Sequence, residues 1–215
     1  RGRNWEPAAV ESFNKRMVAC FNAADGVTIL PTHRLLRDLP GWDAESFLNA
    51  VCRDFSVERA SSAEDLWEKM RQAREEKVFG FRPAVLGGFY LLRAKRQALE
   101  DPLLERHGGA LRGLDVTILH TLLLELHLGI DEARLEAQAH VDYERDRQAC
   151  IRMVDEGRYQ AAFFVNPTTI QQVFEIASRG WRMPQKSTDF YPKLLTGLVF
   201  MKMEILKCQP RDVAP

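Results

Sequence analysis

The 215-residue sequence lacks several features that would each have indicated a class of protein. Lysine plus arginine equals aspartate plus glutamate at 30 each, so the formal net charge is zero. A chain without an excess of basic residues has no broad positive field to attract the phosphate backbone, so we do not expect nucleic acid as a partner. Its four cysteines are far apart with no CxxC spacing. They indicate reduced thiols, not a disulfide framework.

Long hydrophobic runs are also missing. A membrane-spanning helix needs roughly 20 consecutive apolar residues, and the best candidate, residues 114–129, is interrupted by Asp115, His120, Glu125 and His127. We therefore expect no membrane partner and, with reduced cysteines, a cytoplasmic location. The chain starts with arginine instead of methionine and has no apolar signal core, so we expect it to continue a longer protein.

Signals for helices and strands alternate along the chain, without internal repeats. Asp-Gly at 25–26 separates two short apolar runs and predicts a hairpin. Strands are predicted at 17–22, 27–30, 55–59, 78–81, 88–92, 161–165 and 195–203, and a further strand is predicted to start at 139. Helices are predicted at 43–51, 61–76, 114–128, 145–155 and 167–179. A long loop is predicted over 101–113. This order predicts an α+β fold with a mixed sheet, a front β-meander and a C-terminal βαβαβ-like segment. One domain over 1–207 and a tail over 208–215 are expected.

The first candidate motif follows a predicted strand, where His33 and Arg34 stand side by side after Pro31-Thr32. A histidine and an arginine at a strand end can offer one titratable donor and one bidentate fork to a phosphate or carboxylate. A turn with a solvated arginine and a locally satisfied histidine explains the same residues.

A second motif joins the strand at 161–165 to the next helix. Asn166 is a good N-cap, Pro167 suits the first helical position, and the free amides of that first turn form an anion site. Ordinary capping accounts for these residues equally well.

The densest candidate is the loop over 185–193. Two lysines and two hydroxyls within a proline-bounded loop can surround a phosphate, although the loop lacks the glycines of a P-loop and precedes a strand. The alternative is a surface loop with solvated lysines. Its proposed anion-binding residues are Gln185, Lys186, Ser187, Thr188, Tyr191 and Lys193.

Two histidines belong to the predicted helix at 114–128. His120 and His127 are seven residues apart, which an α-helix would place on one face about 10 Å apart, too far to share a metal. Core or boundary positions are expected for both, and no metal site is predicted. The catalytic residues stay unknown at this level.

Four segments together resemble the prokaryotic domain-of-unknown-function family 1015. The segments are Val27-Thr-Ile-Leu-Pro-Thr-His-Arg34, Leu114-Asp-Val-Thr-Ile-Leu-His120 with Leu128-Gly-Ile130, Ala161-Ala-Phe-Phe-Val-Asn-Pro167 and Met183-Pro-Gln-Lys-Ser-Thr-Asp-Phe-Tyr-Pro-Lys-Leu-Leu-Thr-Gly-Leu198. They span nearly the whole chain in the expected order.

The resemblance implies that this chain is the C-terminal half of a longer protein, whose upstream half resembles the ParB and sulfiredoxin superfamily. Some relatives of that group bind nucleotides and certain ones phosphorylate free serine. The resemblance therefore implies a nucleotide- or phosphate-binding part of a phosphotransferase, with ATP and magnesium as cofactors and any catalytic base in the missing half. Asp189 departs from the family pattern, which has an aromatic there. A carboxylate at this position would repel phosphate unless it pairs with Lys186 or Lys193 or holds a metal.

The alternative hypothesis is an interaction or regulatory module without catalysis. Trp181, Phe190 and Tyr191 lie beside prolines, and aromatic residues are enriched at protein interfaces. Such a module would pack on the missing N-terminal half or on a partner protein.

Overall fold

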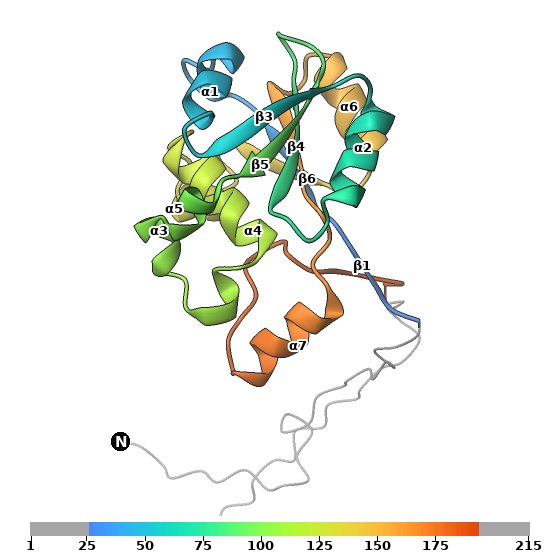
Figure 1. The fold of residues 1–215 in the computed structure, drawn as a ribbon. Helices are drawn as coiled ribbons and strands as arrows, with labels where there is room; N and C mark the ends of the chain where they lie inside the picture. Colours follow the sequence, from blue (N-terminus) through green and yellow to red (C-terminus); the bar gives the residue numbers. More distant parts are fainter. Residues whose placement is uncertain (1–25, 194–215) are drawn as a thin grey trace, which may run out of the picture. The chain divides into compact units, whose positions relative to one another are not determined.

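The structure is a computed structural model that describes residues 26–193, which include the compact unit Thr28–Tyr191. Its class is α+β, which confirms the prediction (Figure 1). The predicted strands at 17–22 and 195–203, together with Cys20 and Cys208, lie outside the described residues. The predicted domain extent of 1–207 stays a prediction.

A six-stranded sheet in the order β3-β5-β4-β7-β2-β6 forms the centre of this unit. Its strands are β2 (His33–Leu36), β3 (Phe55–Ala60), β4 (Val78–Pro83), β5 (Phe89–Ala94), β6 (Val141–Glu144) and β7 (Ala161–Phe164). Within the described residues each pairing is antiparallel, not mixed as predicted. Strands β3 and β4 do run parallel, as do β6 and β7, but β5 and β2 lie between them. Local sequence patterns can identify a helix that connects two parallel strands, but they do not show that a third strand lies between those two strands in the sheet.

A second, two-stranded sheet pairs β1 (Thr28–Leu30) antiparallel with β8 (Asp189–Tyr191). It joins segments about 160 residues apart in the sequence, since Thr28 lies opposite Tyr191 and Leu30 opposite Asp189. The loop that precedes β8 is thereby brought close to the start of β2, three residues after β1.

Most helices begin where side-chain caps predict. Asp43 accepts from the Ser46 amide at the start of α1 (Ala44–Val51), and Ser62 accepts from the Asp65 amide at the start of α2 (Ala63–Gln72). The remaining helices are α3 (Pro102–Glu105), α4 (Asp115–Ile118), α5 (Glu132–Glu136), α6 (Arg147–Asp155) and α7 (Ile170–Ser178), with the short helical turns η2 (Arg96–Glu100) and η3 (Gly109–Leu111). The predicted loop at 101–113 therefore contains two helical turns, α3 and η3.

Helix α7 begins three residues later than predicted. Its N-cap is Thr169, whose hydroxyl accepts from the Gln172 amide while the Gln172 side chain accepts from the Thr169 amide. This reciprocal capping box satisfies two amides at once and outcompetes a single cap from Asn166. The prediction of Asn166 as the N-cap was wrong.

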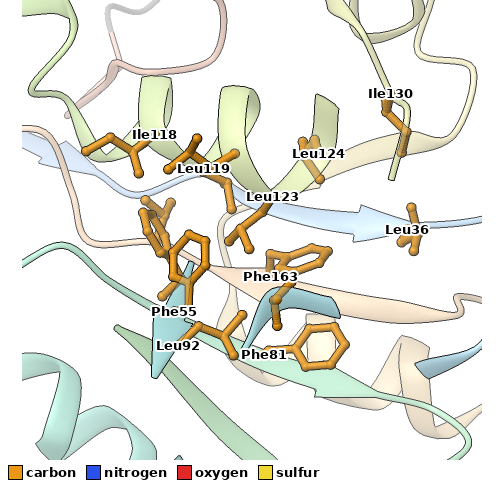
Figure 2. Packing of buried hydrophobic residues seen from close by; sticks show 14 of the residues in the cluster. Leu36, Phe55, Phe81, Leu92, Ile118, Leu119, Leu123, Leu124, Ile130 and Phe163 are labelled. Atoms are coloured by element: carbon orange, nitrogen blue, oxygen red, sulfur yellow. The ribbon is translucent and has the colours of Figure 1, made fainter. Parts of the chain in front are cut away.

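Apolar side chains pack on both faces of the six-stranded sheet. Helices α2 and α6 lie together over one face (Figure 1), where Leu66, Met70 and Val154 pack with Phe164. The other face carries the larger cluster, in which Phe163 and Phe81 lie beneath Leu119 and Leu123 (Figure 2). Neighbouring residues of β7 thus enter opposite layers, as the alternation of a strand requires.

The helix over the larger cluster changes type along its length. After α4 it continues as η4 (Leu119–Leu126), an eight-residue π-helix with wider turns. A π-helix rotates less per residue than an α-helix, so His120 and His127 do not share a face as predicted. His120 contacts Arg34, whereas Nε2 of His127 lies 2.9 Å from a carboxylate oxygen of Asp54.

Across residues 26–193, no helix has the length and apolar character needed to cross a membrane.

Candidate functional site

A cavity of about 530 Å³ lies where the π-helix, α5 and β6 meet the loop that precedes β8. Ligand sites of this size typically combine apolar walls with a few converging polar groups. The lining residues are Arg106, His107, Leu111, Thr117, His120, Thr121, Glu125, Glu132, Leu135, Glu136, Tyr143, Arg182, Met183, Pro184 and Gln185. The cavity thus combines apolar side chains with arginines, histidines and carboxylates.

Arg34 lies directly behind one wall of this cavity and is fully buried. Its Nε donates to Nε2 of His120 at 3.2 Å, and its guanidinium lies 5.4 Å from the ring centre of Tyr143. Its other contacts are the carbonyls of Thr32 and, at 3.4 Å, Lys186. All these hydrogen-bond acceptors are neutral, and burial lowers the pKa of Arg34 to about 10. A buried cation without a carboxylate is costly.

Two histidines of the lining are each held by an arginine. His120 accepts from Arg34, and His107 accepts at Nε2 from Nε of Arg106 at 3.3 Å. Burial, then the nearby Arg34, holds the pKa of His120 well below its usual value, and burial with Arg106 lowers that of His107. Both imidazoles are therefore neutral near pH 7.

The loop preceding β8 is ordered by contacts from the rest of the unit. Lys186 adopts a left-handed backbone conformation with φ of 55°, and its carbonyl accepts from Arg34. The Ser187 hydroxyl donates to the Pro184 carbonyl at 2.5 Å, and the Thr168 hydroxyl donates to the Ser187 carbonyl at 2.9 Å. These bonds fix the loop, and they use the Ser187 hydroxyl that was predicted to contact an anion.

The candidate anion-binding residues of the loop over 185–193 lie in different surroundings. Gln185 lines the cavity. The ammonium of Lys186 lies 5.8 Å from the centre of the Tyr143 ring, which Arg34 also contacts. Thr188 is half-buried, whereas Tyr191 and Lys193 are exposed and do not line this cavity. Arg34, Gln185 and Lys186 are therefore the predicted residues that the structure gathers.

His33 and Arg34 are not brought together. As successive residues of β2 they emerge on opposite faces of the sheet. His33 Nδ1 accepts from the Val165 amide at 3.3 Å, and its ring packs edge-on against Phe164 at 5.1 Å. Burial, followed by the charges of Arg147 and Arg34, lowers the pKa of His33 to about 3. The two side chains cannot contact one anion as the sequence predicted.

Asn166 lines a separate, smaller cavity of about 110 Å³. There, Lys77 and Asp115 form an ion pair at 2.8 Å. Asn166 is buried, and its side-chain nitrogen has no hydrogen-bond partner among the described residues. It therefore lies apart from the cavity behind which Arg34 is placed.

Asp189 forms an ion pair with Arg145 at 3.1 Å. The sequence analysis named a lysine or a metal as what could offset this carboxylate, and the structure shows that an arginine from the turn after β6 is one of its partners. No group of three or more His, Cys, Asp or Glu side chains suited to a metal occurs within residues 26–193.

Sequence reasoning missed most of the cavity, above all His107, Arg182 and Tyr143. His107 stands in a segment taken for a loop, and Tyr143 in a short edge strand. His120 was considered, but only a core or boundary position was expected for it. The one available signal was the polar residues that interrupt the apolar segment at 114–129, because a helix buried in the core does not need them.

A scan against family models matches residues 2–117, more than half of the chain, to the family described as "Protein of unknown function (DUF1015)". No curated protein matches the chain.

Several solved structures share a distant likeness. A conserved hypothetical protein from Pyrococcus furiosus has a TM-score of 0.44 at 13% identity, covering 77% of this chain and 56% of that one. A free serine kinase in complex with AMP has a TM-score of 0.44 at 14% identity, covering 78% and 55%. A mutant free serine kinase in complex with ADP has a TM-score of 0.43 at 13% identity, with the same coverage. This chain spans about half the length of these proteins, and a likeness at this level assigns no function.

Proposed function

This chain belongs to the DUF1015 family, and from that premise we propose that its cavity binds the phosphate group of a small molecule, such as a nucleotide. The site would form part of a phosphotransferase-type centre, as the sequence analysis predicted. The observation that carries the proposal is the buried Arg34, which contacts only neutral hydrogen-bond acceptors immediately behind the cavity wall.

The electrostatic argument rests on the cost of an unpaired charge. Burying a cation costs several kcal/mol unless an anion compensates it, and none of the contacts that Arg34 makes in the described residues supplies one. The guanidinium is separated from the cavity by the His120 and Tyr143 rings. An anion in the cavity would be stabilised by this charge at reduced dielectric, which would explain why the charge is retained there.

Other groups on the lining suit the rest of such a ligand. Arg182 is exposed and Gln185 offers an amide, so both can contact phosphate oxygens. Glu132 and Glu136, contributed by α5, are carboxylates that can accept from hydroxyl groups. Leu111 and Leu135 provide apolar surface. The lining thus fits a phosphate joined to a hydroxyl-bearing body.

The test is a thermal-shift screen of the purified protein against phosphate, AMP, ADP and ATP, with and without magnesium. Binding to the native state alone raises the melting temperature, by the equivalent of about 2.7 kcal/mol at 100-fold excess over Kd. We expect Arg182→Ala to weaken binding about tenfold, because it removes a cation that lines the cavity. Lys186→Ala should also weaken binding, because the Lys186 ammonium lies 5.8 Å from the ring centre of the lining residue Tyr143. Arg152→Ala removes an exposed arginine of α6 that does not line the cavity, and should bind as wild type. An absence of any shift at millimolar ligand would contradict the proposal.

A second candidate function is the interaction module, favoured by exposed aromatic residues. Phe174 on α7, Phe190 and Tyr191 are 61%, 43% and 56% exposed, and aromatic residues are enriched at protein interfaces. This function requires no phosphate ligand. It predicts that the triple variant Phe174→Ser, Phe190→Ser, Tyr191→Ser abolishes pull-down of the upstream half, while Arg182→Ala does not.

A further inference from the structure

The two arginine–histidine contacts in the cavity wall fix the proton positions on both imidazoles. Arg34 Nε and Arg106 Nε lie 3.2 and 3.3 Å from Nε2 of His120 and His107 respectively. A guanidinium has only donors. Each histidine Nε2 must therefore act as the acceptor and carry no proton.

A neutral imidazole without a proton on Nε2 carries it on Nδ1. Both rings are neutral near pH 7, because burial and the neighbouring arginines lower their pKa values. The Thr121 hydroxyl lies 3.1 Å from the same Nε2 of His107. Because that nitrogen has a single in-plane lone pair, the hydroxyl shares it with Arg106 as a weaker second donor. His107 and His120 are thus held as the same tautomer, by two different arginines.

The remaining ring nitrogen is available to a ligand. Nε2 of His120 is occupied by Arg34, which does not line the cavity, whereas His120 itself does. In the described part of the chain, neither Nδ1 forms a hydrogen bond with the protein. The two histidines are also neighbours, because the Thr121 hydroxyl that lies 3.1 Å from His107 belongs to the residue next to His120. Two N–H donors therefore lie near each other on one cavity.

We propose that the Nδ1–H groups of His107 and His120 are the contacts for the phosphate oxygens in this cavity. This inference rests on the proposed function and identifies the residues that perform the recognition. The donors are uncharged, while the positive charge comes from Arg34 behind His120. The charge of Arg106 is largely offset by its ion pair with Glu125. An oxyanion would thus meet directed hydrogen bonds in front and a fixed cation behind them, an arrangement that favours a developing or resident negative charge.

Amide substitutions can separate the two nitrogens of His120. Asparagine places its amide near the position of Nδ1, whereas glutamine reaches that of Nε2. We expect His120→Gln to keep an acceptor for Arg34 and so to unfold at a temperature near that of wild type, but to bind AMP about tenfold more weakly. His120→Asn should bind AMP within about threefold of wild type but unfold at a lower temperature, because Arg34 loses its acceptor.

The same pair of substitutions applies to His107. His107→Gln should lose about tenfold in AMP affinity, and His107→Asn should retain most of it. Equal affinities for the Gln and Asn variants at both positions would overturn the proposal, since the assignment of Nδ1 predicts opposite behaviour. Calorimetric titration with AMP and with inorganic phosphate supplies the affinities, and thermal unfolding supplies the stabilities.

The tautomers can be observed directly by long-range ¹H–¹⁵N correlation spectra of the histidine rings. We expect both rings to show a protonated Nδ1 and an unprotonated Nε2 at pH 7, and AMP to shift the Nδ1 signals. Protonated Nε2 at either ring would overturn the assignment even if AMP binds. If neither AMP nor phosphate binds, the proposed function fails and this inference fails with it, whereas binding that Arg182→Ala weakens but the Gln variants do not would overturn this inference alone.

Discussion

His33 and Arg34 are neighbours on β2, both fully buried, yet they lie in different surroundings. His33 enters the layer under α2 and α6, where it packs against Phe164 and accepts from the Val165 amide. Arg34 enters the opposite layer, where its guanidinium contacts His120 and Tyr143 in the wall of the cavity. His33 is a buried polar residue that forms part of the packing on one face, whereas Arg34 supplies a positive charge to the cavity on the other face. Burial alone does not distinguish these roles; the partners do.

The largest expected effect comes from Phe164→Ala, which tests whether the two faces are independent. Phe164 is fully buried and contacts both His33 and Trp67, so its removal should lower the free energy of unfolding by about 3–5 kcal/mol. The AMP affinity of the folded protein should not change, because this face does not reach the cavity. Urea unfolding and calorimetry at 15 °C give the two values. A loss of affinity would show that the faces are coupled.

Gly80→Ala disturbs the same layer from the middle of β4. An added Cβ would lie 2.9 Å from Leu66 Cδ2, 3.0 Å from Met70 Sδ and 3.1 Å from Phe164 Cβ. Overpacking of this kind costs about 1–3 kcal/mol. We expect that loss in urea unfolding and a wild-type response to AMP in the thermal-shift screen. Unchanged stability would mean that this layer is less tightly packed than the contacts indicate.

Acid should weaken the His33 layer in a defined direction. The pKa of His33 is about 3 in the folded protein and about 6.5 when unfolded. Between these values the unfolded chain binds a proton that the native chain does not, so stability falls as pH falls from 6.5 towards 3. One such histidine contributes about 1.4 kcal/mol per pH unit below 6.5.

The matched variant is His33→Asn, whose side-chain oxygen can still accept from the Val165 amide but does not titrate. Urea unfolding at pH 7 and 5.5 should show a decrease in stability smaller by about 1.4 kcal/mol in the variant than in wild type. Identical decreases would mean that His33 takes up its proton in the native state.

The smallest expected effect concerns the loop on the cavity side. Thr168→Val removes the hydroxyl that donates to the Ser187 carbonyl at 2.9 Å and should cost about 1 kcal/mol. Because the loop also contributes Gln185 to the cavity, AMP affinity should fall by a factor of about two to five. An affinity identical to wild type would show that the other contacts of the loop, including that of Arg34 with the Lys186 carbonyl and the β1–β8 pairing, hold it in place without Thr168.

Locally encoded features could be predicted from the sequence. The caps at Asp43 and Ser62 and the β4–β5 hairpin have short-range causes, and the α+β class follows from their order. The insertion of β2 between β6 and β7 could not be predicted, since strand neighbours depend on pairing between distant segments.

The cavity was less predictable than the fold. Arg34 and His120 are 86 residues apart, and their contact depends on the π-helix, for which the residues around 119–126 give no simple periodic signal. Asn166 was predicted as the N-cap of α7 from its local preference for that position, but the structure has the capping box of Thr169 and Gln172 at the start of the helix. Of the predicted residues, Arg34 is gathered at the site together with Gln185 and Lys186, which the β1–β8 pairing brings near it.

The measurement that tests the central claim most directly is the affinity of AMP for Arg34→Met, determined by calorimetry below the unfolding temperature of the variant. Methionine keeps much of the side-chain volume and removes the buried charge. Phe164→Ala is the control, because it should be destabilised without losing the ligand. We predict that Arg34→Met binds AMP about 10–100-fold more weakly than wild type while Phe164→Ala binds normally. Wild-type affinity in Arg34→Met would contradict the claim that this buried cation serves a phosphate in the cavity.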